Sequence, residues 1–570
     1  MSSPECPRCS IPKRDARTVT RACRLHLHRP SRRAQEPDIA TPSVARSTAM
    51  MSASTLVSRL TGFMRTWAMG YALGLTVLAD SYDIANNLPN MLFELLAGGV
   101  LSSVFIPLFM ERMKKDGEQD AWKFASYVLN IIVLVLGAIA LVATLWPDPF
   151  VRSQTLTISA ERSEVAIWLF RFFAVQIVFY GMGLVFTGVL NSYRRFLAPA
   201  VAPVFNNLVV TVTLLGFYVP FRDSNPQLAL TGLAVGTTLG VVTMAAVQIP
   251  SILKLGGRYT PRIDWRHPGI VTIGAKMVPT LIYVVTNLVS VTFRTNFAVA
   301  TGEGGQAALR YAWQFYQLPY GIFAVALATA IFPELAERAN ARDMSGFKQM
   351  FARGLRSTMV LIVPLAGLLA TLATPVITLY QAGRFTADDV PVVAGVLSWW
   401  ALGLTFYAGY MFVLKSFYSL QDTRTPMYTN IVATTIHIVL YAVLARGIAG
   451  WDGLGIIGIP IADGIFFCGH LLALSIILRK RIGALDGRAI AWTFVKVVAS
   501  SVAGAAAAWL LMQLTAGLAD IPAGFIVQLF VAGTGGLVVA YGAMALLRVP
   551  ELGEVAGRLT KRFGRRRVES

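Results

Sequence analysis

The chain has 570 residues, of which 55% are hydrophobic and only 14% are charged. This composition excludes an ordinary soluble protein of this length. The net charge of +20 would suit a nucleic-acid partner, but the basic residues cluster between hydrophobic segments, as topology signals do in membrane proteins. We therefore expect no nucleic-acid partner.

Residues 1–50 are basic and contain no apolar run, which predicts a disordered cytoplasmic tail. From Cys6 to His26 the tail has the spacing C-x2-C-x13-C-x2-H, which is compatible with zinc. A single match of this kind arises easily by chance in a tail rich in proline and arginine. We therefore predict no metal site and no cofactor.

Long apolar stretches recur along the rest of the chain. A hydrocarbon core about 30 Å thick requires about 20 apolar residues per helix, and this ruler predicts an all-α polytopic membrane protein with 14 transmembrane helices. The predicted spans are residues 54–77, 82–110, 124–146, 165–191, 198–220, 228–253, 269–300, 307–335, 356–381, 389–418, 426–447, 453–478, 489–515 and 523–547.

The distribution of basic residues supports this count and predicts the orientation. If the N-terminus is cytoplasmic, the cytoplasmic loops between spans contain 21 Lys and Arg residues and the opposite loops contain six. Cytoplasmic loops are normally the richer in Lys and Arg. We therefore expect a multi-pass membrane protein with both termini in the cytoplasm.

An internal repeat is visible at an offset near 230 residues. The stretch 86–112 resembles 316–338, and 190–199 resembles 417–426, so that corresponding prolines align. An even number of spans per copy gives both copies the same orientation in the membrane. The repeat predicts two six-helix lobes related by a pseudo-two-fold axis, with a cavity between them and two extra helices at the C-terminal end.

The predicted domains follow from the spans and the repeat. They are the tail 1–50, a first lobe 51–255, a second lobe 256–485, two C-terminal helices within 486–550 and a basic cytoplasmic tail 551–570.

The first predicted span contains two arginines, Arg59 and Arg65. A charge at bilayer depth is costly and marks a functional site by default. The two residues are six positions apart, so they point about 120° from each other and could border one wide cavity. Guanidinium groups suit a phosphate-bearing ligand, although Arg59 could instead snorkel to the headgroups. Asp80, near the end of the span, could pair with an arginine or be a solvated loop residue.

The sequence contains no Walker A motif, no H-E-x-x-H and no G-x-S-x-G. We therefore predict a transporter and not an enzyme. Without a nucleotide site, transport would be driven by an ion gradient, the membrane potential or the substrate gradient.

Several stretches resemble a known family. They are SRLTGFMR (58–65), ADSYDIANNLPN (79–90), LNSYRRFLAPAVAP (190–203), QLPYGIFAVALATAIFP (317–333), QAGRFTADD (381–389) and FYSLQDTRTP (417–426). Together they resemble the MurJ/MviN family of lipid II flippases, which belongs to the MOP (multidrug/oligosaccharidyl-lipid/polysaccharide) exporter superfamily.

The resemblance implies a function in peptidoglycan and cell-wall biogenesis. It implies that the chain flips the undecaprenyl-pyrophosphate-linked disaccharide-pentapeptide from the cytoplasmic to the outer leaflet by alternating access. The partners would be membrane lipids and cell-wall synthesis proteins. By resemblance, Arg59 and Arg65 match two essential arginines, Asp80 the acidic residue after them and Asn90 the asparagine of the LPN motif. The lateral opening would lie between spans 1 and 8, and the lipid tail would follow spans 13 and 14.

The chain departs from the family pattern at three positions. Family members carry adjacent arginines where this chain has Phe93 and Glu94, and an essential arginine of the eighth helix corresponds to Gln314. We expect Arg294 and Arg310 to replace the missing cations, because Arg310 lies one turn before Gln314. The expected substrate-binding residues are therefore Arg59, Arg65, Asp80, Asn90, Arg294, Arg310 and Gln314.

Three other functions remain open from the sequence. A flippase for another polyprenyl-pyrophosphate-linked sugar would need the same cations. A drug or cation antiporter of the same superfamily would favour carboxylates in the cavity. A membrane scaffold that does not transport would explain the missing arginines.

Overall fold

The computed structural model describes residues 44–97, 100–518 and 524–553, and the architecture below concerns the unit that begins at Ala53. The predicted tails, including the cysteine motif, fall largely outside the described residues. Regular structure in the described part is helical, apart from two isolated β-bridges, Ala382 with Phe385 and Ile448 with Trp451.

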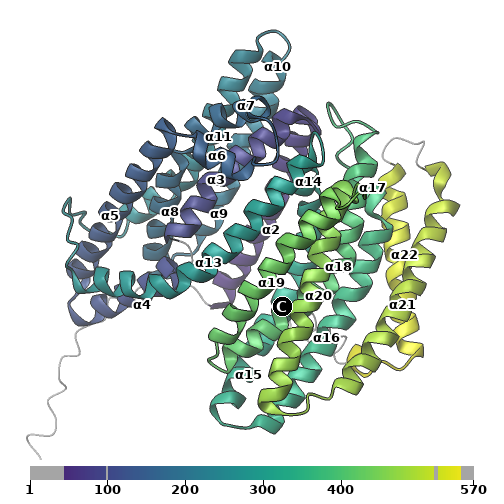
Figure 1. Cartoon of the computed structure of the whole chain (residues 1–570). Helices are drawn as coiled ribbons and strands as arrows, with labels where there is room; N and C mark the ends of the chain where they lie inside the picture. The colour runs from purple at the N-terminus through teal and green to yellow at the C-terminus, as the bar shows by residue number, and fades with distance from the viewer. Residues whose placement is uncertain (1–43, 98–99, 519–523, 554–570) are drawn as a thin grey trace, which may run out of the picture. The chain divides into compact units, whose positions relative to one another are not determined.

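The helices are numbered along the chain as in Figure 1. Those of the first half are α2 (Val44–Leu73), α3 (Val77–Ala97), α4 (Val100–Lys115), α5 (Glu118–Leu145), α6 (Asp148–Gln154), α7 (Ala160–Phe173), α8 (Gln176–Ser192), α9 (Leu197–Val212), η1 (Thr213–Tyr218), α10 (Val219–Phe221), α11 (Pro226–Ala246) and α12 (Ile249–Leu253). Those of the second half are α13 (Pro268–Ala300), α14 (Gly305–Pro319), η2 (Tyr320–Ala324), α15 (Val325–Asn340), α16 (Met344–Thr371), α17 (Ala373–Thr378), α18 (Asp389–Ser419), α19 (Arg424–Tyr441), η3 (Ala442–Arg446), η4 (Gly455–Ile457), α20 (Gly458–Ile482), α21 (Gly487–Leu514), η5 (Ala516–Leu518) and α22 (Gly524–Leu546).

Ten described helices are long and apolar enough to cross a membrane, or eleven if the bent pair α7 and α8 forms one span. The predicted spans 54–77, 82–110 and 269–300 also coincide with helices, but these contain the polar residues of the candidate site and are not among the ten. The all-α membrane fold is confirmed, and the count of fourteen spans stays a prediction.

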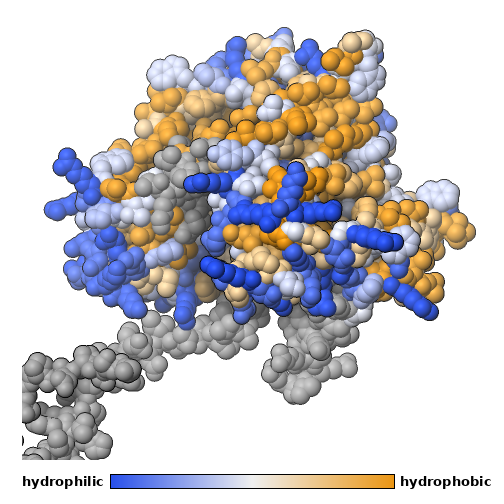
Figure 2. Space-filling view, turned by 60° about the horizontal axis from the view of Figure 1, so that its bottom comes forward, coloured by the Kyte–Doolittle hydropathy of each residue, from blue (hydrophilic) through white to orange (hydrophobic). Residues whose placement is uncertain are grey.

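The surface has the character expected of a protein surrounded by lipid. Large apolar side chains are exposed along the helices, for example Leu141, Val502 and Phe530. Figure 2 shows hydrophilic residues concentrated over one end and hydrophobic residues over the adjoining flank. This distribution fits a protein whose flank contacts lipid hydrocarbon and whose end contacts water.

The helices of each half pack mainly among themselves. In the first half, α3 packs on α7, α5 on α8 and α9 on α11; in the second half, α16 and α20 both pack on α18, and α21 packs on α22. Helices α13 and α14 also contact α3 of the first half, and Figure 1 shows α13 running between the two groups. These contacts place α3, α13 and α14 together.

The internal repeat continues in the local helix geometry. Pro199 and Pro426 are each the third residue of their helix, α9 and α19, within the first turn where proline costs no backbone hydrogen bond. Both helices then end in a π-helical segment, η1 and η3. π-Helical turns are rare, so their recurrence at corresponding positions supports the repeat.

Aromatic packing holds α2 against α14. The ring of Phe63 lies 5.6 Å from that of Phe315 and 5.7 Å from that of Tyr380, measured between centroids. Tyr311 lies 5.6 Å from Tyr380 and 5.7 Å from Phe385. Aromatic pairs at these separations each contribute about 0.5–1.5 kcal/mol beyond the burial of their area. This cluster fixes the first arginine-bearing helix beside α14.

Candidate functional site

A cavity of about 210 Å³ lies between α3, α13, α14 and α18. Its polar lining residues are Asp83, Asn87, Asn90 and Glu94 from α3, Arg294 from α13, and Gln306 and Arg310 from α14. Its apolar lining residues are Met91, Leu288, Val291, Leu309, Trp313 and Trp400. Guanidinium groups, carboxylates and amides thus face one space. Ionisable residues inside membrane helices mark substrate pathways by default.

The polar residues of α3 share one helical face. Asp83, Asn87, Asn90 and Glu94 are separated by four, three and four positions, which is the spacing of a single stripe on an α-helix. The sequence prediction included only Asn90 from this stripe. The spacing of the other three was the signal that would have identified them.

Arg310 is held at the cavity by a carboxylate from the opposite half of the chain. Its Nη1 lies 3.5 Å from Oδ1 of Asp83, and the Gln306 side-chain amide donates to Asp83 Oδ2 at 2.8 Å. The Asp83 side chain is buried, whereas that of Arg310 is 33% exposed. The guanidinium therefore has an anchoring ion pair and a face that remains open to a ligand.

Arg294 lies on the other side of the cavity. Its electrostatic partners include Asp463 and the hydroxyl of Tyr441, both outside the cavity lining. Its buried Nε atom has no hydrogen-bond partner among the described residues. A buried guanidinium donor without a partner is costly, and an anionic ligand would satisfy it.

Asp80 lies outside this cavity and caps a helix. Its two carboxylate oxygens accept hydrogen bonds from the backbone N–H groups of Gly304 and Ala307, each at 2.9 Å. Gly304 directly precedes α14 and has a φ of 74°, and a Cβ there would lie 2.6 Å from the Cβ of Leu75. Asp80 is therefore neither a solvated loop residue nor the partner of an arginine. It satisfies free N–H groups at the start of α14.

Further bonds join the end of α2 to the second half of the chain. The Tyr311 hydroxyl donates to the carbonyl of Gly74 at 3.0 Å, and the Arg384 backbone N–H donates to the carbonyl of Tyr71 at 2.9 Å. We name the residues that join the end of α2 to its surroundings the junction cluster. It consists of Tyr71, Ala72, Gly74, Asp80, Arg222, Asp223, Gly304, Ala307, Tyr311 and Arg384.

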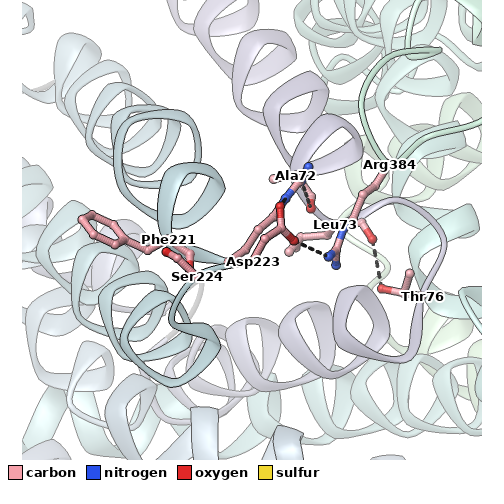
Figure 3. Close-up of polar contacts among 8 residues, drawn as sticks. Ala72, Leu73, Thr76, Phe221, Asp223, Ser224 and Arg384 are labelled. Carbon is pink, nitrogen blue, oxygen red and sulfur yellow. Dashed lines mark hydrogen bonds and ion pairs between the residues drawn. The ribbon is translucent and has the colours of Figure 1, made fainter.

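Figure 3 shows the exposed part of the junction cluster, where Asp223 points toward Arg384 beside the end of α2. The Arg384 guanidinium lies 3.6 Å from Asp223, and Arg222 donates to the carbonyl of Ala72 at 3.2 Å. Gly74 has a φ of 63°, and a Cβ there would lie 2.4 Å from the Arg384 carbonyl oxygen. Only glycine fits this close approach.

Arg59 and Arg65 of α2 do not line the cavity. Arg59 is exposed, and its Nη1 donates a long hydrogen bond of 3.4 Å to Gln317 of α14. Arg65 is half-buried, its Nε has no hydrogen-bond partner among the described residues, and it interacts electrostatically with the Tyr180 hydroxyl. Gln314 is half-buried on α14 and also lies outside the lining. The structure therefore joins Asn90, Arg294 and Arg310 in the cavity and leaves the other four predicted residues outside it.

Phe93 and Glu94, at the two positions where the family has adjacent arginines, lie in different surroundings. The Phe93 ring packs 5.8 Å from the ring of Tyr180, and the Glu94 side chain lines the cavity. The cavity thus receives a carboxylate where the resemblance leads one to expect a cation. The described cations of the cavity lining are Arg294 and Arg310.

The comparisons of sequence point to one family. The family model described as "Lipid II flippase MurJ" matches residues 69–521. A "Lipid II flippase MurJ" of Burkholderia cenocepacia is 29% identical over 443 residues, which cover 76% of this chain and 83% of the relative. A "Probable lipid II flippase MurJ" of Rhizobium tropici is 30% identical over 406 residues, covering 70% and 75%.

Solved structures support the fold. One described as "Lipid II flippase MurJ, inward closed conformation" superposes with a TM-score of 0.69 at 23% identity and covers 88% of this chain and 99% of its own. An inward-facing multidrug resistance MATE transporter of the MOP superfamily gives a TM-score of 0.61 at 15% identity, covering 77% and 99%. Since the family model spans most of the sequence, the chain belongs to the lipid II flippase MurJ family.

Proposed function

We propose that this protein flips lipid II, the undecaprenyl-pyrophosphate-linked disaccharide-pentapeptide, from the cytoplasmic to the outer leaflet of a bacterial inner membrane. The observation that carries the proposal is the cavity inside a membrane fold of the MurJ family, in which Arg294 and Arg310 face several amides and two carboxylates, one of which is paired with Arg310. Guanidinium groups suit a diphosphate, and side-chain amides can both donate to and accept from sugars and peptides.

The two cavity arginines take the place of the family cations that are missing at Phe93, Glu94 and Gln314. Arg294 brings a buried Nε without a partner, and Arg310 is anchored by Asp83 with one face open. Arg310 is therefore oriented before the ligand arrives, and Arg294 has a donor that the ligand would satisfy. Preorganised donors bind an anion with less loss of side-chain entropy.

The cavity must enlarge for the headgroup to bind. Its volume of about 210 Å³ is below the roughly 300–1,000 Å³ of ordinary small-ligand pockets, and a disaccharide-pentapeptide is a large ligand. We infer two lobes that separate and close again, as the repeated geometry of α9 and α19 supports. The junction cluster closes one end of the space between them.

Arg59 and Arg65 act earlier, on the path to the cavity. Arg59 contacts Gln317 where α2 faces α14, which is where the resemblance puts the lateral opening. The long hydrogen bond between the two side chains is weak, so the guanidinium can exchange it for a diphosphate. The Nε–H group of Arg65 has no hydrogen-bond partner among the described residues, so it can donate to the diphosphate.

The lipid tail stays in the bilayer along α21 and α22, which expose apolar side chains. These include Val502, Trp509, Phe530 and Val538. Only the headgroup needs shelter, because each polar group without a partner costs several kcal/mol in hydrocarbon. The bias of basic residues supports an orientation with both termini in the cytoplasm. Cell-wall synthesis enzymes would supply the substrate on one side of the membrane and consume it on the other.

Depletion of the protein in its host cell, with complementation by variants, tests the proposal. We expect lipid II to accumulate in the inner leaflet on depletion, and neither Arg294→Ala nor Arg310→Ala to restore growth. Arg152→Ala is the matched control, because Arg152 forms an exposed pair with Asp148 within α6. Accumulation of a different polyprenyl-linked sugar, or full rescue by both cavity variants, would overturn the proposal.

A further inference from the structure

The cavity lining contains two carboxylates that lie in different surroundings. Asp83 is buried, pairs with Arg310 and accepts a hydrogen bond from the Gln306 side chain. Glu94 is exposed, and within the described part of the chain its carboxylate makes no ion pair and no hydrogen bond. Asp83 therefore holds the cavity together, whereas Glu94 presents to the cavity a negative charge that no described residue neutralises.

Glu94 also reverses the charge that the family resemblance leads one to expect at this position. An arginine there would attract a diphosphate, and a carboxylate repels one. The carboxylate accepts hydrogen bonds and donates none when it is ionised, so it suits a ligand group that is cationic and rich in N–H donors. The exchange therefore changes which part of a ligand this position can contact.

Glu94 lies at the opposite end of the polar stripe of α3 from the pair of Asp83 and Arg310. Asp83 and Glu94 are eleven positions apart in one helix, which separates them by about 16 Å along the axis. Asn87 and Asn90 lie between them on the same face and line the same cavity. The lining thus runs from a guanidinium, past two neutral amides, to a free carboxylate.

A ligand that matches this order has an anion at one end, uncharged polar groups in the middle and a cation at the other end. The proposed substrate combines a diphosphate, two sugars and a peptide of five residues. An extended peptide of that length reaches at most about 17 Å, so a cationic side chain on it can reach Glu94 while the diphosphate contacts Arg310. A primary ammonium carries three donors on a flexible stem and fits a single exposed carboxylate.

We propose that Glu94 is a specificity-determining residue, which binds a primary ammonium on the peptide of the substrate headgroup. The inference rests on the proposed function and deepens it, because it assigns one end of the cavity to the diphosphate and the other end to the peptide. A headgroup with a neutral group at this place leaves the carboxylate without its partner, and one with an acidic group is repelled. Glu94 thereby selects among headgroups that share the same diphosphate.

Binding of two lipids to the full-length protein in nanodiscs of phosphatidylcholine, which has no net charge to attract the ammonium, tests the assignment. The first is lipid II with one lysine in its peptide, and the second is the same lipid with that lysine acetylated at Nζ, which removes the charge. We expect the wild type to bind the first lipid about threefold more tightly, a size typical of an exposed ion pair. Glu94→Gln should bind both lipids equally, and Glu94→Arg should prefer the acetylated one.

Two further variants separate this inference from the proposed function. Arg310→Gln should weaken the binding of both lipids and keep their ratio, because Arg310 contacts the diphosphate that they share. Asp148→Asn is the matched control: it removes an exposed carboxylate of α6 that lies outside the cavity lining, and it should keep the wild-type affinities. If neither lipid binds the wild type, the proposed function fails. If the wild type binds both equally, or if Glu94→Gln keeps the wild-type preference, the ammonium site is refuted.

Discussion

Helix α2 is joined to the second half of the chain in two different ways, one at its C-terminal end and one near its middle. At the Gly74 end, the junction cluster uses buried backbone groups: Asp80 caps α14, and Tyr311 bonds the Gly74 carbonyl. Fifteen residues earlier, exposed Arg59 makes a long hydrogen bond to Gln317. Buried bonds to backbone groups are costly to break, whereas exposed ones exchange readily with water. The C-terminal end of α2 is therefore closed, and the contact near its middle can open at little cost.

The largest effect in this comparison should come from Asp80→Ala. The substitution leaves the N–H groups of Gly304 and Ala307 without their acceptor, which should cost about 3 kcal/mol in the free energy of unfolding. Unfolding in mixed detergent micelles measures the loss, and amide hydrogen exchange over 304–307 should accelerate. Asp80→Asn keeps one acceptor oxygen and should lose less. Unchanged exchange in Asp80→Ala would mean that the cap does not hold this end closed.

The role of Asp80 could not be predicted from the sequence. Its partners lie 224 and 227 residues away and are backbone groups, so no pattern of side chains indicates them. The cavity stripe is the opposite case. Asp83, Asn87, Asn90 and Glu94 follow helical spacing in the sequence, so their shared face was predictable from periodicity alone. Their partners on α13 and α14 were not, because the packing of distant helices decides them.

The helical fold itself was predictable because apolar stretches of about 20 residues admit few other structures in a membrane. The repeat stays a prediction, which the recurrence of Pro199 and Pro426 at the same helix position supports. The place of Trp400 in the cavity lining was not predictable, because the sequence around an aromatic residue in a long apolar helix does not indicate that it faces a polar cavity. Single-residue roles depend on tertiary contacts, which periodicity does not encode.

The pair of Asp83 and Arg310 should give the next largest effect. Removing one partner of a buried ion pair leaves a charge uncompensated, but Arg310 is partly exposed, so we expect about 2 kcal/mol for Arg310→Gln. A double-mutant cycle with Asp83→Asn, measured by unfolding in mixed micelles, isolates the coupling. Additive single effects would show that the pair contributes no coupling between α3 and α14.

Arg59→Ala should change stability by only about 0.5 kcal/mol, because its hydrogen bond to Gln317 is long and exposed. Transport should nevertheless be lost, since the guanidinium is needed for the substrate. Gln317→Ala removes the same hydrogen bond and keeps the guanidinium, so it should complement a depleted cell. If Gln317→Ala fails as completely as Arg59→Ala, the contact itself is what matters, and the middle of α2 is held more tightly than we infer.

The smallest effect should come from the ion pair of Arg384 and Asp223 at the exposed edge of the junction cluster. The Asp223 side chain is 76% exposed and the charged atoms are 3.6 Å apart, so their coupling should be about 0.3 kcal/mol and should fall further in high salt. Arg384→Ala keeps the backbone N–H that bonds the Tyr71 carbonyl, so this end should stay closed by hydrogen exchange. A double-mutant cycle with Asp223→Ala in low and high salt measures the pair. A coupling as large as that of Asp83 and Arg310 would mean that surface charges, and not buried backbone bonds, hold the junction cluster together.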